Sequence, residues 1–325
     1  MMPSLDELLG SAHVVSLGLF DRFRGLNRRE ALLLEGPEGW TEFSPFVEYD
    51  DAESANWLRA AIDFGWQSTP HALRTTIPVN ATVPAVPAHK VAEVLARFPG
   101  CRTAKVKVAS PDQTLADDVA RVAEVRRVLG PEGRIRIDAN GLWNVDEAEH
   151  AIHALSGFDL EYIEQPCMTV PELAEIRHRT AYLSVPIAAD ESVRKTGDPL
   201  AVARAGAADI LVIKAQPLGG IRAALSIIGQ TGLPVVVSSA LDTSVGLSMG
   251  AHLAASVPGL YFDCGLGTAS LLADDVTSQP LLPVNGEIPV RRVVPDRLAE
   301  HAASAERRDW WLARLARTHA LLAAE

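Results

Sequence analysis

Short apolar runs that each end in one charged residue recur along the middle of the chain. The terminal charged residues are Lys107, Asp138, Glu164, Asp190 and Lys214, at intervals of 24 to 31 residues. Intervals of this size accommodate one strand, one helix and two loops. The pattern therefore predicts a repeated βα unit with parallel strands.

Eight strands fit this pattern in sequence. We expect them at 77–81, 103–108, 135–140, 162–166, 187–191, 210–214, 235–238 and 261–264. Helical periodicity predicts helices at 88–97, 116–129, 145–155, 170–179, 199–205, 221–230 and 245–255. Such units can also build an open doubly wound sheet. We prefer a barrel, because eight strands fit without a reversal and no Gly-rich phosphate loop follows the first strand. In a closed barrel the five charged residues would meet on one face.

The segments that flank the repeat have other patterns. Strands are expected at 13–20, 30–34 and 40–46, with a polar loop of four arginines at 21–29 and a helix at 51–66. Residues 290–325 begin in extended form and continue as a helical tail with Trp310 and Trp311. We expect this tail to pack on the N-terminal unit with its tryptophans buried. An amphipathic membrane helix is the alternative.

Composition narrows the class of protein. Of the 325 residues 48% are apolar, as in globular enzymes, and the formal net charge is −11. Nucleic acid is therefore not expected as a partner, because its phosphates would be repelled, although local lysines or a metal ion still permit an anionic substrate. The three cysteines form no CxxC motif, and residues 1–11 have no basic region or long apolar run. We expect a cytoplasmic protein with reduced thiols, no signal peptide and no membrane span.

Three consecutive strands are predicted to end in acidic residues, namely Asp138, Glu164 and Asp190. Three carboxylates that point at one place repel each other unless a cation lies between them. Oxygen ligands at a polar site suit Mg²⁺ best, with Mn²⁺ as a substitute. The alternative is that each acid separately caps a helix or pairs with a lysine. Three such acids flanked by lysines favour the metal site.

Lysines lie on both sides of these acids. Lys105 and Lys107 are two residues apart on one strand, so their side chains face the same side, and Lys214 would lie across the pocket. Like charges and a nearby dication lower the pKa of a lysine, which makes a neutral amine available as a base. A metal ion between two lysines suits removal of the proton next to a substrate carboxylate. Charge balance for the acids is the alternative role.

A set of motifs carries a family resemblance. The motifs are Lys105-Val106-Lys107, Asp138-x-Asn140, Glu164-Gln165-Pro166, Asp190-Glu191-Ser192 and Lys214-x4-Gly219-Gly220. Together they resemble the enolase superfamily, muconate-lactonizing subgroup, over nearly the whole chain. The resemblance implies an α/β fold with an N-terminal α+β capping domain (1–76), a (β/α)7β TIM-like barrel (77–289) and a C-terminal return onto the capping domain (290–325).

The resemblance also implies roles for individual residues. Asp138, Glu164 and Asp190 would bind Mg²⁺. Lys107 and Lys214 would be the acid/base pair, and Lys105 would orient the substrate carboxylate. Asn140 and Glu191 would support the metal ligands from behind. The implied partner is a small carboxylate substrate, and the sequence leaves the oligomeric state open, a monomer included.

Further motifs are similar to the o-succinylbenzoate synthases within this subgroup. They are Phe23-Arg24-Gly25 with Arg29-Glu30, the segment Ser238 to Gly246, and Gly265-Leu266-Gly267-Thr268. This resemblance implies dehydration of a cyclohexadiene carboxylate with a succinyl arm, in menaquinone biosynthesis. Ser238, Ser239 and Gly265 are candidate substrate contacts, although a helix cap is an equal reading for the two serines. Arg24 is a candidate for shaping a lid, and a solvated loop arginine is the alternative.

Other functions remain open at this point. An N-succinylamino acid racemase needs the same two lysines, and a muconate cycloisomerase is a further alternative. A dipeptide epimerase is disfavoured, since Asp263-Cys264-Gly265 contains only one acid where that activity uses an Asp-x-Asp pair. A barrel without activity, serving as a binding or scaffold protein, is the alternative outside enzymes. It would have no reason to keep five charged groups together in one pocket.

Overall fold

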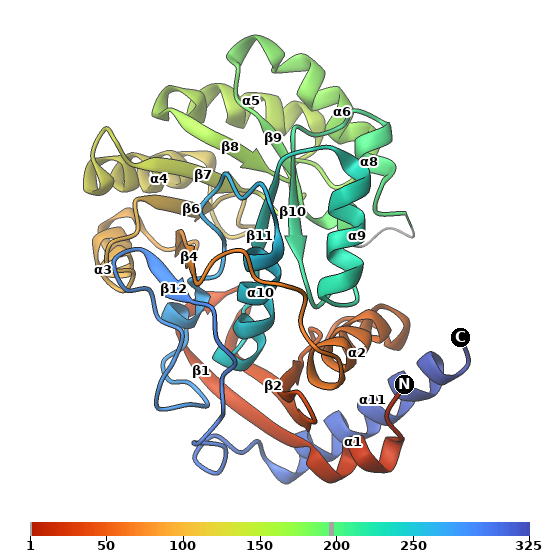
Figure 1. Cartoon of the computed structure of the whole chain (residues 1–325). Coiled ribbons are helices and arrows are strands. Elements are labelled where there is room, and N and C mark those ends of the chain that lie inside the picture. The colour runs from red at the N-terminus through yellow and green to blue at the C-terminus, as the bar shows by residue number, and fades with distance from the viewer. Residues whose placement is uncertain (1, 195–197) are drawn as a thin grey trace.

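The computed structural model describes residues 2–194 and 198–325 of the chain. Within these ranges the strands form a three-stranded antiparallel sheet, a seven-stranded parallel sheet and a two-stranded antiparallel sheet. The parallel sheet curls into a barrel with helices outside it, and the three-stranded sheet belongs to a smaller unit packed beside it (Figure 1).

The smaller unit is the α+β capping domain. Its elements are α1 (Leu5–Ser11), β1 (His13–Phe23), β2 (Leu26–Gly36), β3 (Gly39–Phe43) and α2 (Asp51–Trp66). The predicted bounds of α2 are confirmed, and the side chain of Asp50 caps it by accepting from the Glu53 N–H. The predicted loop at 21–29 is wrong. The strands continue to a tight turn at Arg24 and Gly25, whose φ angles of +51° and +76° suit a two-residue hairpin.

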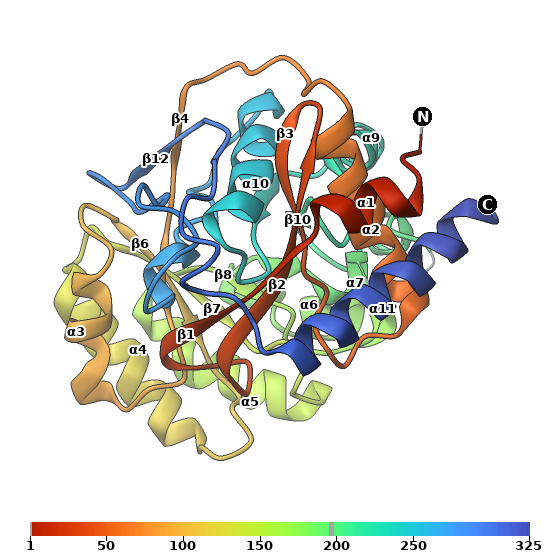
Figure 2. The same ribbon diagram turned by 90° about the horizontal axis from the view of Figure 1, so that it is seen from below.

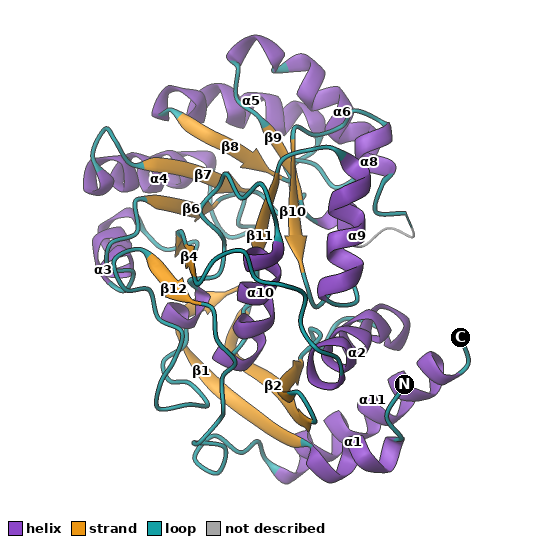
Figure 3. Ribbon diagram, in the orientation of Figure 1, coloured by secondary structure: helices purple, strands orange, loops and turns teal. Residues whose placement is uncertain are grey.

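The parallel sheet has the strand order expected for sequential βα units (Figure 3). Its strands are β5 (Ala81–Val83), β6 (Thr103–Lys107), β7 (Arg134–Asp138), β8 (Leu160–Glu164), β9 (Ile187–Ala189), β10 (Ile210–Lys214) and β11 (Val235–Ser238). The helices around it are α3 (Val91–Ala96), α4 (Leu115–Leu129), α5 (Val145–Leu155), α6 (Val170–Arg179), α7 (Glu191–Arg194), α8 (Ala201–Arg204), α9 (Ile221–Thr231) and α10 (Ser244–Ser256).

The two ends of the barrel differ from the sequence prediction. The first strand was expected at 77–81, but β4 (Thr76–Pro78) pairs with β12 (Glu287–Pro289), and the parallel strand begins only at Ala81. Between these two strands the Val79 N–H donates to Gly286 and the Asn80 N–H donates to Cys264, so this stretch pairs with the C-terminal part of the chain. The eighth strand, expected at 261–264, is reduced to isolated parallel bridges with Val79, Val235 and Ser238. These bridges close the barrel between its first and seventh strands.

The C-terminal helix α11 (Ala305–Ala323) packs on the capping domain beside α1 and α2, near the N-terminus (Figure 2). Trp311 is fully buried in the capping-domain core with Phe43 and Trp57, and Trp310 is partly buried. The apolar face of the tail is therefore used within the fold, as predicted, which contradicts the membrane-helix alternative. In the described part of the chain no helix is both long and apolar enough to span a membrane. The exact domain boundaries stay a prediction.

Candidate active site

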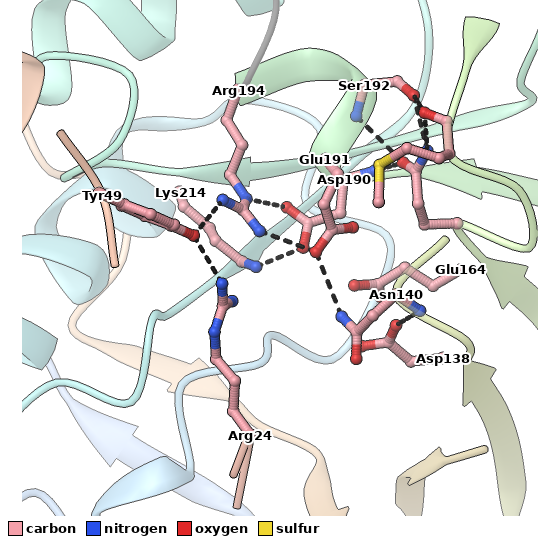
Figure 4. A network of polar contacts seen from close by, with 12 residues as sticks. Arg24, Tyr49, Asp138, Asn140, Glu164, Asp190, Glu191, Ser192, Arg194 and Lys214 are labelled. Atoms are coloured by element: carbon pink, nitrogen blue, oxygen red, sulfur yellow. Dashed lines mark hydrogen bonds and ion pairs between the residues drawn. The ribbon is translucent and has the colours of Figure 1, made fainter. Parts of the chain in front are cut away.

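The register of the parallel sheet places the predicted site residues at one level. Lys107 pairs with Asp138, and Asp138 pairs with Glu164, at the C-terminal ends of β6, β7 and β8. Asp190 directly follows β9, and Lys214 is the last residue of β10. A cavity of about 660 Å³ lies over these strand ends, between the barrel and the capping hairpin β1–β2. Figure 4 shows the carboxylates and their neighbours.

Each of the three carboxylates is fully buried and paired with a lysine. Lys105 Nζ lies between Asp138 and Glu164, at 2.9 Å and 2.5 Å from their oxygens. Lys107 Nζ is 2.5 Å from Asp138, and Lys214 Nζ is 2.5 Å from Asp190. The barrel thus brings the three lysines and three acids together, as the sequence pattern predicted.

Burial and these charges shift the pKa values in different directions. Burial alone would raise the pKa of Asp138, but Lys105 and Lys107 together hold it far below the usual aspartate range. Burial and the Asp138 carboxylate raise the pKa of Glu164 to about 7. For Lys107, burial outweighs the attraction of Asp138 and lowers the pKa of the ammonium group. Divergent shifts within one pocket are typical of catalytic sites.

Asn140 and Glu191 connect the lysine and acid clusters. Asn140 Oδ1 accepts from Lys107 Nζ at 2.7 Å, and its Nδ2 donates to Glu191 Oε1 at 3.2 Å. Glu191 also accepts from Arg194, a buried residue that sequence reasoning missed. The spacing of Asp190 and Arg194, four residues apart at a helix start, was the signal that could have found it.

The candidate substrate contacts all line the cavity, namely Arg24, Lys105, Ser238, Ser239 and Gly265. The N-cap of α10 is Thr243, which contradicts the helix-cap reading of the two serines. A Cβ on Gly265 would lie 2.3 Å from Ser238 Oγ, so a larger residue there would displace the Ser238 side chain. Arg24 is exposed at the hairpin turn, yet its guanidinium stacks 4.0 Å from the Phe46 ring centroid and donates to the Tyr49 hydroxyl, so its role in a lid stays a prediction.

A second buried cluster, also missed from the sequence, holds the loop after β11. Glu42 of β3 accepts from the Thr243 hydroxyl and from the N–H groups of Thr243 and Gly246, and so caps α10 across the domain interface. Arg29 donates to the carbonyl of Leu241 at 3.0 Å. Burial and the adjacent Glu42 raise the pKa of Asp242 to about 7. The capping domain therefore fixes the cavity wall formed by residues 238–241.

The donor set suits a hard divalent cation, since its three carboxylates offer only oxygen ligands. Glu164 Oε2 is buried and accepts no hydrogen bond from the described residues, so it could take a ligand position. The ammonium groups of Lys105, Lys107 and Lys214 contact oxygens of these three carboxylates. Accordingly, no group of three or more His, Cys, Asp or Glu side chains within residues 2–194 and 198–325 is set to hold a metal ion.

A closed barrel with acids on successive strand ends, covered by an α+β domain, defines a protein of the enolase superfamily. Residues 14–65 match the family described as "Enolase N-terminal domain-like", and residues 87–297 match "Enolase C-terminal domain-like". The muconate lactonizing enzyme from Pseudomonas putida has a TM-score of 0.72 at 19% identity, over 90% of this chain and 98% of that one. The L-Ala-D/L-Glu epimerase from Bacillus subtilis has a TM-score of 0.74 at 22% identity, over 86% and 95%. These structures establish the fold, and superfamily members depend on a divalent metal ion.

Similarity to curated proteins is much closer. The o-succinylbenzoate synthase of Mycolicibacterium smegmatis is 53% identical over 99% of both chains. The o-succinylbenzoate synthase of Mycobacterium marinum is 52% identical over 98% of this chain and 96% of its own length. This chain belongs to the o-succinylbenzoate synthase family.

Proposed function

We propose that this protein is an o-succinylbenzoate synthase of menaquinone biosynthesis. It would dehydrate 2-succinyl-6-hydroxy-2,4-cyclohexadiene-1-carboxylate to 2-succinylbenzoate, with Mg²⁺ as cofactor. One observation carries the proposal. Lys107 and Lys214 lie four strands apart on the barrel, each beside a buried carboxylate, in a cavity lined by the motifs of this family.

Lys107 is the proposed base. Burial lowers the pKa of this lysine, which favours the neutral amine that proton removal requires. Its amine takes the proton from the carbon next to the ring carboxylate, and the C–H electron pair moves into that carboxylate. The C–O bond then breaks, the proton on Lys107 leaves with the hydroxide as water, and the ring becomes aromatic. Departure from the same face needs only one acid/base group.

The other two lysines would act through charge. Lys214, on the opposite side of the barrel, would stabilise the enediolate through a cation–π contact without transferring a proton. Lys105 lies deeper than Lys107 on β6 and would orient the substrate carboxylate. Asn140 holds Lys107 through a 2.7 Å hydrogen bond, which keeps the amine directed into the cavity.

Asp138, Glu164 and Asp190 would hold the Mg²⁺ ion, with Mn²⁺ as a substitute. Bound there, a divalent cation supplies positive charge beside the substrate carboxylate and favours the charge that develops on proton removal. The unpaired Glu164 Oε2 and the raised pKa of this carboxyl group, caused mainly by burial, support the assignment, because a bound cation would stabilise the charged form of a buried acid.

The test is a spectrophotometric assay of the cyclohexadiene substrate, whose absorption changes when the ring becomes aromatic. The wild-type chain with Mg²⁺ should turn over, and Lys107→Ala should lower kcat by about 100- to 10,000-fold or more. Lys90→Ala, at an exposed lysine outside the cavity, is the matched control and should keep wild-type kcat. Wild-type protein that leaves the diene unchanged would refute the proposal.

N-succinylamino acid racemase is the second candidate, because the same two lysines on opposite sides of the barrel also suit that reaction. Racemisation needs one group to take a proton from one face and another to return a proton to the other face. Deuterium incorporation into N-succinyl amino acids measures this activity. Racemisation without diene turnover would move the assignment to this function.

A further inference from the structure

A continuous set of polar contacts joins the tip of the capping hairpin to the barrel acids (Figure 4). The Tyr49 hydroxyl oxygen lies at its centre, in the segment between β3 and α2. It accepts from Arg24 at 2.8 Å and from Arg194 at 3.0 Å. Arg24 belongs to the hairpin turn, whereas Arg194 belongs to α7 at the barrel mouth. Tyr49 therefore connects a capping-domain arginine to a barrel arginine.

Arg194 also donates to two carboxylates, through its other two nitrogens. Its Nε donates to Asp190 Oδ1 at 3.0 Å, and its Nη2 donates to Glu191 Oε1 at 2.8 Å. The second oxygen of Asp190 is held by Lys214 at 2.5 Å. A guanidinium group is planar and rigid, so the hydrogen bond from its third nitrogen, Nη1, to Tyr49 also fixes its orientation toward both acids.

The contacts continue as far as the proposed base. Glu191 Oε1 also accepts from Asn140 Nδ2, and Asn140 Oδ1 accepts from Lys107. The orientation of Arg194 can therefore affect both lysines of the site. It reaches Lys214 through Asp190, and it reaches Lys107 through Glu191 and Asn140.

We propose that Tyr49 and Arg194 are positioning residues, through which the capping domain sets the orientation of the Asp190 and Glu191 carboxylates. The proposal rests on the proposed function, because it concerns a metal ligand of that site. Tyr49 is buried, and its ring packs edge-on against Phe46 and Trp57, which line the cavity. Tyr49 itself is not among the described residues that line the cavity, so in this proposal it acts through Arg194 and not by touching substrate.

The Tyr49 hydroxyl is needed neither to neutralise charge nor to pack the ring. The two arginines that meet at the Tyr49 oxygen are each neutralised by separate acids, Arg24 by Glu48 and Arg194 by Asp190 and Glu191. The hydroxyl is thus not needed to balance charge, and a phenylalanine would serve the ring contacts equally well. What the hydroxyl adds is a fixed direction for two guanidinium groups.

The experiment measures Mn²⁺ binding to the full chain by titration calorimetry without substrate. Tyr49→Phe should weaken Mn²⁺ binding by about 3- to 10-fold. Arg194→Lys keeps the positive charge but loses the planar guanidinium with its several donors, so it should weaken Mn²⁺ binding by about 10- to 100-fold. In the double variant, Tyr49→Phe should add less than about 2-fold to the effect of Arg194→Lys, since it acts through that residue. Tyr182→Phe, at a tyrosine 64% exposed, is the matched control and should bind as wild type.

A second readout uses no metal. Amide hydrogen exchange should quicken at 191–194 and at the hairpin tip in Tyr49→Phe, and not in Tyr182→Phe. Wild-type Mn²⁺ affinity in Tyr49→Phe, or a full additive loss in the double variant, would overturn the proposal. If the wild-type chain binds no Mn²⁺, the proposed function fails instead, and unchanged exchange in Tyr49→Phe would then refute the link by itself.

Discussion

Replacing Asp242 by asparagine tests the electrostatics of the domain interface. Asp242 is buried, with 5% of its surface exposed, and its Oδ2 accepts from the Ala240 N–H at 3.3 Å. Asparagine has nearly the same shape and can accept that hydrogen bond through its amide oxygen. The substitution therefore removes one titratable carboxyl group from the domain interface without opening a cavity.

The size of the effect follows from the pKa. In the folded protein, burial and the neighbouring Glu42 raise the pKa of Asp242 from 3.8 to about 7. Between these two values the folded protein holds a proton that the unfolded chain has released, so the free energy of unfolding falls as pH rises. From pH 5 to pH 8 this loss amounts to about 3 kcal/mol for a single group. The Asp242→Asn variant should not show this loss of unfolding free energy, because its amide does not titrate.

Urea unfolding at pH 5, 6, 7 and 8 measures the difference. The free energy of unfolding of Asp242→Asn, minus that of wild type, should increase by about 3 kcal/mol across this range. Any constant offset from the new amide cancels, because only the change with pH counts. Asp309→Asn, at an aspartate of α11 with 68% of its side chain exposed, should run parallel to wild type. A parallel curve for Asp242→Asn would show that the interface does not shift this carboxyl group.

Four further predictions concern the core, a helix cap, the cofactor and the base. Trp311→Ala should lower the free energy of unfolding by about 3–5 kcal/mol in urea titrations, because the indole is fully buried. Thr169→Ala, which removes the capping box of α6, should cost about 1 kcal/mol in the same assay. Treatment with EDTA should abolish diene turnover, and added Mg²⁺ should restore it; activity that survives chelation contradicts the metal assignment. Because burial lowers the pKa of Lys107 below 10.5, kcat/KM should rise with pH through a midpoint below that value.

The sequence predicted those elements whose ends are marked locally. The predicted bounds of α5 and α6 agree with the structure, and both helices begin with a capping box, at Asn144 and Thr169. Errors occurred where a tertiary contact decides the structure. Residues 21–29 look like a polar loop, but pairing of β1 with β2 extends both strands to the turn. Pro78 and the bridges at Cys264 similarly depend on how the barrel closes.

The site was predictable to the extent that it follows strand register. Residues at the ends of parallel strands must meet, so Lys107, Asp138 and Glu164 could be grouped from their positions alone. Their supporting groups could not be found in this way. Tyr49 and Arg194 are 145 residues apart, and Glu42 and Thr243 are 201 apart, so only the docking of the capping domain joins them. The catalytic and ligand roles stay predictions until the assays above are made.

The chain contains only five lysines, and Lys105, Lys107 and Lys214 line the same cavity. Reagents that acylate amines react with the neutral form, which burial favours at Lys107. At Lys107 such a reagent would report on the interior of the pocket, whereas the attraction of Asp138 and Glu164 raises the pKa of Lys105 and keeps that amine charged. Bound substrate should shield the cavity amines, so the labelling rate provides an occupancy assay. For the same reason, attachment to a solid support through amines would risk blocking the reaction centre.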